Sequence, residues 1–389
     1  MISLEHRLRA ALAQAGDDRQ QARARADLAA FLARMGRYPE AERELQQVPE
    51  SARWGSAELA AALLFAEAMM ALRDEFNLGA LDRLRRGHAI ASAARLPAAA
   101  VDFASWAAHA EFNQDRLDGM AHWVRQCLDL ITSATPTARA RLALTCATAW
   151  LATGHRPHAD LWFGRVRAHV ARTGDEAFMA AALYNRAAYG VWLARLEWAE
   201  GRAFSVPLTH LHMEIESAEH YAAATGNEGA RQLQRLWKAR VLLLMGRPAE
   251  ALELLDAALP SLPEARHSPF AQYADTDRLQ ALVELGRLDE AQAAWSAGEL
   301  PDLDAAVPPK GSLGEHDGDT DSLEPVQAGA DGLRVWMHQR MGAALALGQP
   351  APPDTARRIE GARRRHQAYV QRLSAVVERL HQGLLSAPE

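Results

Sequence analysis

The sequence predicts an all-α protein made of repeated helical hairpins. The segment "LLLMGRPAEALELLDAAL", which begins at Leu242, returns forty residues later as "LVELGRLDEAQAAWSAG", which begins at Leu282. Two earlier copies are "LARMGRYPEAERELQQV" from Leu32 and "LATGHRPHADLWFGRV" from Leu151. Apolar residues between the copies recur at the three- and four-residue spacing of an amphipathic helix, and no segment shows a convincing strand pattern.

The four copies agree at three positions. They share a glycine (Gly36, Gly154, Gly246, Gly286), an alanine five residues later (Ala41, Ala159, Ala251, Ala291) and a bulky residue nine residues later (Leu45, Phe163, Leu255, Trp295). Glycine permits the left-handed backbone conformation that ends a helix. The small alanine lets two antiparallel helices approach closely, and the bulky side chain fills the space between them. We therefore expect each glycine at the junction of a hairpin.

The spacing of the last two copies predicts three further junctions, near residues 76, 115 and 200. At the second, Asp115 stands in place of the glycine in "QDRLDGMAHWVRQCL". At the first, "DEFNLGALDRL" keeps Ala80 and Leu84 in the expected relation. At the third, "EWAEGRAFSVPL" predicts a second helix that starts late, near Pro207. Seven hairpins then account for residues 22–298.

The pattern ends after the seventh hairpin. Residues 299–332 contain nine acidic residues against the single Lys310, with several glycines and prolines, which predicts a flexible acidic loop. Helical sequence resumes at Leu333 and stops at Gly348. A last helix is predicted from about Thr355 to Leu385. Its apolar stripe comprises Val370, Leu373, Val377, Leu380 and Leu384.

The G-x-x-x-x-A-x-x-x-[bulky] pattern resembles the tetratricopeptide repeat (TPR) superfamily. That resemblance implies a right-handed α-solenoid of about seven TPR-like helical hairpins over residues 1–298, with C-terminal helices at 333–389 capping the solenoid. The period of about 40 residues exceeds the standard 34. In this respect the chain is more similar to TPR arrays of bacterial regulators than to those of co-chaperones.

Composition argues against several classes of function. A net charge of −6 gives no whole-protein case for binding to nucleic acid or to a membrane. Glu5, Arg7 and Arg9 interrupt the apolar run that a signal peptide needs. The most apolar stretch, Leu59 to Leu72, contains Glu67 and is too short to cross a bilayer. We therefore expect a cytoplasmic protein of bacterial type.

Two patterns suggest metal ligands but lack a complete set. Asp317, Asp319 and Asp321 have the spacing of a calcium-binding EF-hand loop, yet the twelfth position, where a bidentate glutamate is needed, is Ala328. We interpret this segment as a solvated acidic loop, and the sequence predicts no metal site there.

A histidine pair near residue 216 also falls short. His212, Glu216 and His220 lie on one helix face, but the separation of eight positions between the two histidines spans about 12 Å of helix rise. They cannot all bind one ion, so a polar exposed face is the preferred interpretation. His155 and His158 flank a hairpin turn and are expected to cap it.

The cysteines and a basic run are given structural interpretations. Cys127 and Cys146 are predicted at matching heights on neighbouring antiparallel helices, as two buried, reduced thiols rather than a redox pair.

The arginines between Arg357 and Arg365 have Glu360 among them and no aromatic platform. They are expected to form a solvated helix face rather than a phosphate-binding surface.

Catalytic motifs are missing from the sequence. It contains no phosphate loop, no G-x-S-x-G, no H-E-x-x-H and no catalytic cysteine context, so we expect neither an enzyme nor a cofactor.

Two neighbouring first helices carry the candidate binding residues. In a solenoid of hairpins, the first helices line a concave face that binds peptides or partner helices. The fifth contributes Asn185, Tyr189 and Trp192, and the sixth contributes Arg231, Arg235 and Lys238, each set at i, i+4 and i+7. Together they could hold an acidic or C-terminal peptide group. The alternative is ordinary core aromatics beside a solvated basic face.

Three hypotheses for function follow. The first is a non-enzymatic scaffold or adaptor that binds a protein or peptide. The second is a sensory or regulatory module of a bacterial signalling or transcription system that acts with a separate output protein. The third is a hydrolytic or metal-dependent activity near residues 210–220. The sequence favours the first and leaves the identity of the partner and the oligomeric state open.

Overall fold

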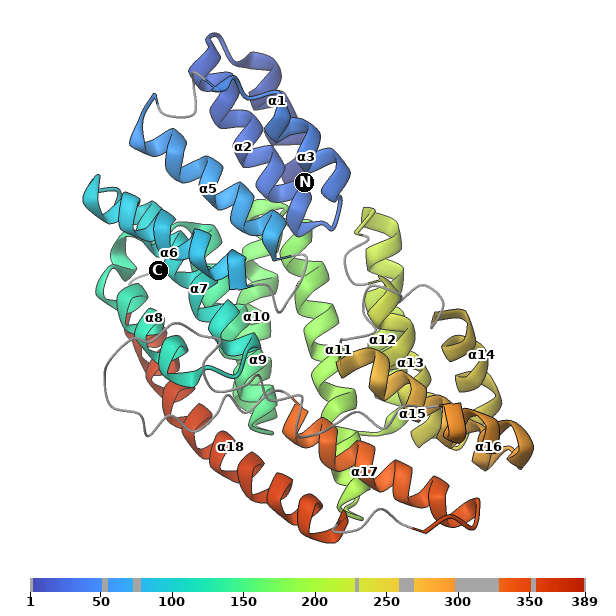
Figure 1. The fold of residues 1–389 in the computed structure, drawn as a ribbon. Coiled ribbons are helices and arrows are strands. Elements are labelled where there is room, and N and C mark those ends of the chain that lie inside the picture. Colours follow the sequence, from blue (N-terminus) through green and yellow to red (C-terminus); the bar gives the residue numbers. More distant parts are fainter. Residues whose placement is uncertain are drawn as a thin grey trace. The chain divides into compact units, whose positions relative to one another are not determined.

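A computed structural model describes residues 3–50, 55–72, 78–227, 231–258, 269–297, 329–350 and 355–387 of the chain. Every regular element in these ranges is helical, and no strand occurs in them (Figure 1). The prediction of an all-α fold is confirmed. The helices pack against their neighbours in chain order, which is consistent with an α-solenoid.

Within the described ranges, the helices from α2 to α16 form seven pairs along the region that was expected to hold seven hairpins. The pairs are α2 (Asp18–Arg34) with α3 (Tyr38–Gln46), α5 (Ala57–Ala71) with α6 (Leu78–Ala93), α7 (Pro97–Asn113) with α8 (Leu117–Asp129), α9 (Pro136–Ala152) with α10 (Arg156–Thr173), α11 (Glu176–Ala199) with α12 (Leu208–Thr225), α13 (Arg231–Leu244) with α14 (Pro248–Ala258), and α15 (Pro269–Glu284) with α16 (Leu288–Ala297). A short helix, α1 (Leu4–Gln14), precedes them, and a 3-10 turn, η1 (Ile131–Ser133), links α8 to α9.

Left-handed residues close the turns where the repeat pattern placed them. All four aligned glycines have positive φ angles, for example 74° at Gly36 and 70° at Gly286. Asp115, the expected substitute, has φ 55° between α7 and α8. A backbone hydrogen bond closes each of these turns across the end of the first helix. In the first copy, Arg37 N donates to Leu32 O at 2.9 Å. The junction expected near residue 76 lies outside the described residues.

The repeat also has left-handed turns that the alignment did not predict. Arg95 (φ 56°), Gly174 (62°) and Gly226 (68°) lie between one pair and the next. Glycine, asparagine and aspartate tolerate this conformation best, so an arginine is unusual here. Backbone hydrogen bonds keep Arg95 in this conformation. Its N–H donates to Ser92 O, and the next residue closes the turn onto Ala91 O.

The two helices of a pair can pack closely because an alanine recurs five residues after the turn glycine. Ala41, Ala159, Ala251 and Ala291 are all 0% exposed. Of the bulky residues one turn later, Phe163 and Leu255 are buried, whereas Leu45 and Trp295 are only partly buried. Trp295 is covered instead by the guanidinium of Arg340, 4.8 Å from its ring centroid.

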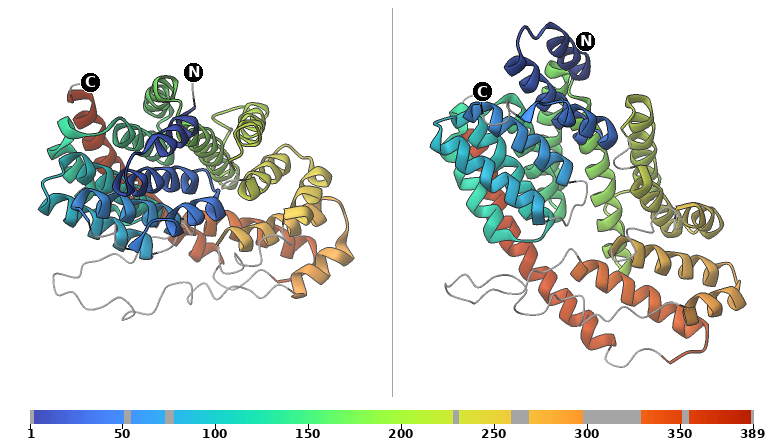
Figure 2. Two further views of the ribbon diagram at one scale, coloured as in Figure 1. Left: turned by 90° about the horizontal axis from the view of Figure 1, so that it is seen from above. Right: turned by 45° about the horizontal axis from the view of Figure 1, so that its top comes forward.

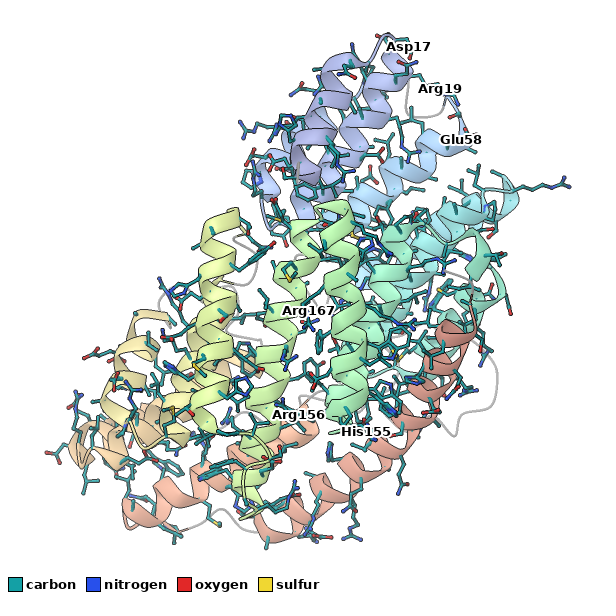
Figure 3. The ribbon with its side chains drawn as sticks, turned by 180° about the vertical axis from the view of Figure 1, so that it is seen from behind. Asp17, Arg19, Glu58, His155, Arg156 and Arg167 are labelled. Atoms are coloured by element: carbon teal, nitrogen blue, oxygen red, sulfur yellow. The ribbon has the colours of Figure 1, made fainter. Side chains whose placement is uncertain are left out.

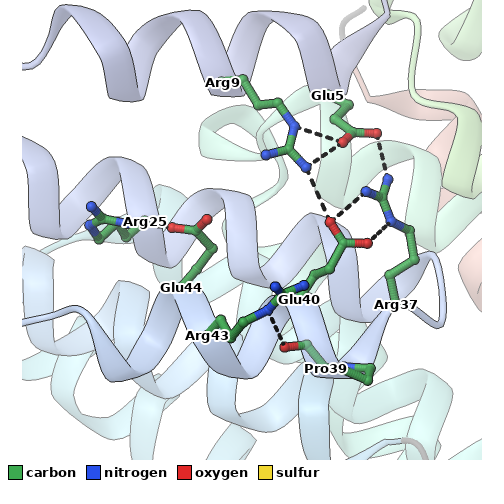
Figure 4. Close-up of polar contacts among 8 residues, drawn as sticks. All are labelled: Glu5, Arg9, Arg25, Arg37, Pro39, Glu40, Arg43 and Glu44. Atoms are coloured by element: carbon green, nitrogen blue, oxygen red, sulfur yellow. Dashed lines mark hydrogen bonds and ion pairs between the residues drawn. The ribbon is translucent and has the colours of Figure 1, made fainter.

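An arginine–glutamate pair recurs directly after the turn glycine. Arg37 donates from Nε and Nη2 to the two oxygens of Glu40 at 2.6 and 2.7 Å (Figure 4). The same pairing joins Arg247 to Glu250 and Arg287 to Glu290. The last two pairs are exposed and contribute little to stability. The pattern G-R-x-x-E is visible in the sequence but formed no part of the alignment.

The C-terminal helices differ slightly from the prediction. α17 (Gly329–Ala346) begins four residues before the expected Leu333, and Gly348 follows it with φ 66°. α18 (Thr355–Ser386) matches its expected bounds within one residue. In its stripe, Val370 is partly exposed, and the other four residues are buried in one core with residues of α8, α9 and α10. Figure 2 shows the C-terminal part of α18 (red) beside helices of the first unit. The calcium-like segment at 317–321 lies outside the described residues.

Two compact units divide the chain, and each is described by itself. The first comprises Met1–Leu193, Met213–Gln234 and Ala368–Glu389, and the second comprises Ala194–His212 and Arg235–Gln367. None of the helices in the described ranges is long and apolar enough to span a membrane.

The second unit is tied together by a buried carboxylate. Asp277 on α15 is 0% exposed and accepts from Arg195 Nη2 of α11 at 2.9 Å and from Arg240 Nε of α13 at 2.8 Å. Gln339 of α17 donates to the same carboxylate at 3.1 Å and accepts from Arg195 at 2.8 Å. One carboxylate therefore joins four helices that are distant in the sequence.

Asp277→Asn should destabilise the protein by about 3–5 kcal/mol, because it leaves two buried guanidinium groups without their negative partner. Asp256→Asn is the control, since Asp256 pairs with Arg278 at 2.7 Å but its side chain is 49% exposed. That change should cost less than about 1 kcal/mol. Denaturant unfolding measures both, and equal effects would contradict the role of Asp277.

Ala251→Leu should overpack the α13–α14 hairpin and lower the free energy of unfolding by about 1–3 kcal/mol. The matched control is Ala257→Leu on the same helix, because Ala257 is exposed. The control should change stability by less than about 0.5 kcal/mol. An unchanged melting midpoint in Ala251→Leu would show that the repeat alignment is wrong.

Candidate binding site

The first helices of neighbouring pairs contact one another directly in the first unit. α2 packs on α5, and α7 packs on α9. Trp106 and His109 of α7, with Arg141 and Thr145 of α9, are called the arginine cluster. Arg141 lies over the ring of Trp106, the ring of His109 lies edge-on to Trp106 at 5.9 Å, and Thr145 is one turn from Arg141 on α9. The members on each helix are three or four residues apart, so each pair shares one face.

Arg141 is a buried cation between aromatic rings. It is 3% exposed, and its guanidinium carbon lies 4.8 Å from the ring centroid of Trp106 and 5.8 Å from that of Phe178 on α11. Burial, and after it the nearby charge of Arg34, together lower the pKa of Arg141 to about 9. The group is therefore still charged at neutral pH.

Arg34 is another largely buried arginine of the first unit, and its charge is compensated by a carboxylate. Its side chain is 10% exposed, and its guanidinium also lies over Phe178, at 5.1 Å. Asp175 supplies the negative charge, with Arg34 Nη1 donating to it at 3.0 Å. No carboxylate in the described ranges forms an ion pair with Arg141, so the two arginines differ in charge compensation.

Around the arginine cluster, ring and amide side chains remain partly exposed. Phe65 of α5 lies edge-on to Trp106 with ring centroids 6.4 Å apart, and Asn113 of α7 lies 3.2 Å from His109. Tyr189 of α11 stacks on Phe112 at 6.3 Å. These partly exposed groups come from the first helices α5, α7 and α11, and ring and amide side chains of this kind are suited to contact a polypeptide.

The three residues predicted on the fifth first helix lie on the part of α11 that belongs to the first unit. Asn185 of α11 donates from Nδ2 to Thr148 Oγ1 of α9 at 3.3 Å. Tyr189 lies one turn further along α11, and Trp192 meets it edge-on at 6.1 Å. All three are partly exposed, so they are neither fully buried core residues nor freely solvated.

Two of the three predicted cations belong to the second unit. Arg235 and Lys238 on α13 are partly buried members of the second unit. The side chain of Arg231 lies outside the described residues. Whether these cations share a groove with Asn185 and Tyr189 stays a prediction.

Sequence reasoning missed the arginine cluster, although a signal exists. In α9, which is otherwise rich in alanine and leucine, Arg141, Thr145 and Thr148 stand at i, i+4 and i+7. Polar residues at that spacing on a buried helix mark one face that needs polar partners.

A second polar group in the first unit consists of aromatic and histidine rings at the start of α10. The rings of His155 and His158 stack 4.1 Å apart, and His158 lies 4.7 Å from both Trp150 and His381. His155 is at the N-cap position but makes no side-chain capping bond, so the predicted cap is wrong. Its ring packs on other rings instead. Figure 3 shows His155 and Arg156 at this end of the helix.

His381 of α18 connects this group to the core. Trp162 Nε1 donates to His381 Nδ1 at 2.9 Å, and His381 is 5% exposed. Its pKa is lowered, first by burial and then by the charges of His158, Arg165 and His155, while Glu378 opposes the change. Protonation at Nδ1 would also remove the acceptor of the Trp162 bond.

Lower pH should therefore destabilise the first unit through His381. A histidine whose pKa is lower in the native state favours the neutral form, so its contribution to stability is lost as pH falls through the ordinary value near 6.5. His381→Asn keeps an acceptor but does not titrate, and it should reduce the loss of stability between pH 7.5 and about pH 5. His220→Asn, at an exposed position, is the control. Identical pH profiles for wild type and His381→Asn would contradict this role.

The remaining candidates show no assembled metal or redox chemistry in the described ranges. No group of three or more histidine, cysteine, aspartate or glutamate residues there could hold a metal ion. Both cysteines are buried and unbonded, and burial raises their pKa values, which disfavours the reactive thiolates. Arg357, Arg363 and Arg364 are exposed on α18.

A hollow of about 750 Å³ lies between α1, α2 and the start of α5. Asp17, Arg19 and Glu58 lie at its border (Figure 3). Its charges pair with one another, as Arg19 does with Glu58 at 3.3 Å and Arg23 with Asp27 at 3.0 Å. It therefore offers less unbalanced charge to a ligand than the arginine cluster does.

Comparison with protein-family models, with curated proteins and with solved structures finds no match to this chain.

Proposed function

We propose that this protein is a non-enzymatic scaffold or adaptor that binds a protein or peptide through the concave face of a TPR-like solenoid. The observation that carries the proposal is the face formed by α7, α9 and α11 in the first unit. Partly exposed ring and amide side chains surround a buried arginine there. Aromatic and arginine side chains of this kind contribute most of the binding energy in protein interfaces.

The partner is proposed to carry an acidic segment. Arg141 brings a positive charge to this face. Arg235 and Lys238 of the second unit are separate predicted contacts for such a partner. Complementary charge favours encounter with an acidic partner and makes binding sensitive to salt. A captured partner that is itself a signalling or transcription protein would favour the regulatory form of this function.

Asn185→Asp should weaken partner capture, because it places a negative charge on the face proposed to receive an acidic segment. Affinity capture from the native cell, followed by mass spectrometry, identifies the partners and their amounts. The double change Arg235→Ala with Lys238→Ala should weaken capture and reduce its salt dependence, with nearly the same melting temperature.

Arg167→Ala is the matched control, because Arg167 is an exposed arginine on the second helix α10 (Figure 3). It should leave capture unchanged. If Asn185→Asp and the double variant capture the same partners with the same salt dependence as the wild type, the proposed binding face is wrong.

A further inference from the structure

Five buried hydrogen-bond donors on the contacting helices α7 and α9 have no acceptor among the described residues. Three of them are the Nε and Nη2 groups of Arg141 and the indole Nε1 of Trp106. The others are His109 Nδ1 and the Thr145 hydroxyl. Buried polar groups are nearly always hydrogen-bonded in native proteins, so five on two contacting helices need a common explanation.

The proton of His109 can be assigned from its neighbour. Asn113 Nδ2 lies 3.2 Å from His109 Nε2, and an amide nitrogen can only donate, so Nε2 accepts. Burial, together with the charge of Arg141, lowers the pKa of His109 well below its usual value. The ring is therefore neutral at pH 7 and carries its proton on Nδ1, which makes that atom a donor.

The free edge of Arg141 has the geometry that binds a carboxylate. The N–H groups on Nε and Nη2 lie on one side of the planar guanidinium and point the same way. That arrangement matches the two oxygens of a carboxylate in a bidentate pair. Both of these donors are unpartnered, whereas the faces of the guanidinium are covered by the rings of Trp106 and Phe178.

Nearby carboxylates already have other partners. Asp102 of α7 accepts from Thr135 Oγ1 at 2.6 Å. Glu111 of α7 pairs with Arg85 at 3.2 Å and with Arg116 at 2.7 Å. Asp175 is engaged by Arg34, so the described part of the chain supplies no counter-charge to Arg141.

We propose that the arginine cluster binds one carboxylate group of the partner, an inference that rests on the proposed function. Arg141 takes both oxygens, and Trp106, His109 and Thr145 donate to their remaining lone pairs. The site has one positive charge, because His109 is neutral, and a carboxylate has one negative charge. A phosphate monoester carries nearly two at neutral pH and would leave a buried negative charge unbalanced. The same carboxylate chemistry could come from an acidic side chain, from a chain terminus or from a free small acid.

Stability provides a first test. An unpaired buried cation lowers stability, and stacking on two rings offsets only part of this loss. Arg141→Met removes the charge at similar volume and should raise the melting midpoint of the full-length protein by about 2–5 °C. Arg165→Met is the matched control, since Arg165 also stacks on an indole, that of Trp162 at 4.6 Å, but is partly exposed. The control should show no gain.

Response to sodium acetate tests the ligand class. At about 100 mM, acetate should raise the melting midpoint of the wild type by about 3 °C over chloride at equal ionic strength. Arg141→Met should lose this rise, and Arg165→Met should keep it. Phosphate at the same ionic strength should have a smaller effect than acetate. Equal midpoints in acetate and chloride, a rise retained by Arg141→Met, or a larger response to phosphate would each overturn the proposal.

Two further variants keep the test decisive if Arg141→Met does not fold. Thr145→Val removes one donor at nearly constant volume, and Trp106→Phe removes the indole N–H while keeping a smaller aromatic ring. Each should reduce the acetate response at least two-fold. An unchanged response in both would overturn the proposal.

Capture of the partner separates this inference from the proposed function. If acetate acts through Arg141 and also displaces the captured partner, the carboxylate belongs to the partner. If acetate acts through Arg141 while capture is insensitive to Asn185→Asp and to acetate, the ligand is a free small acid and the proposed partner-binding function fails. If capture depends on Asn185 but acetate has no effect, the function stands and the carboxylate site fails.

Discussion

The close approach of two antiparallel helices is the constraint on which the rest of this structure depends. A residue with a positive φ angle ends the first helix, the chain reverses within about two residues, and an alanine on the second helix faces the first without a bulky side chain between them. Gly246 and Ala251 show this relation in one of the clearest copies. Because the same short pattern is used along the chain, first helices such as α7 and α9 come into contact with one another. Those contacts position the polar face of the first unit.

Buried arginines have different partners in the two units, a carboxylate for Arg195 and Arg240 in the second and aromatic rings for Arg141 in the first. This difference indicates where a binding site lies. In the second unit, Arg195 and Arg240 converge on Asp277, so buried cations share a carboxylate and hold four helices together. In the first unit, Arg141 is equally buried but has aromatic rings in place of an acid. A buried charge without compensation lowers stability, and strained or uncompensated groups concentrate at functional sites. This difference is the physical basis for proposing that the missing negative charge belongs to a partner.

The C-terminal helix has a structural role that reaches far along the chain. Leu373, Val377 and Leu380 enter the core of the first unit, and His381 accepts a hydrogen bond from Trp162, more than two hundred residues earlier. The histidine rings around this bond stack on one another and on indole rings, so their nitrogens do not converge on one point in the way that metal ligands do. A neutral His381 holds α18 on α10, which links the stability of this contact to pH.

Much of the fold could be predicted from the sequence, because turns and helix packing depend on local rules. The left-handed turn at Gly36, the substitute turn at Asp115, the late start of α12 and the bounds of α18 all follow from residue spacing.

The candidate site could be predicted only in part. Asn185 and Tyr189 were predicted because their spacing places them on one helix face. The spacing of Arg141, Thr145 and Thr148 also marks a polar helix face, but it does not show whether that face is solvated or buried. The burial of Arg141, the rings of Trp106 and Phe178 around it, and the engagement of the nearby acids by other arginines depend on contacts between helices remote in the chain. Only tertiary packing decides such contacts, because hydrogen-bond partners and burial are properties of neighbours in space, whereas turns and helix faces are properties of neighbours in sequence.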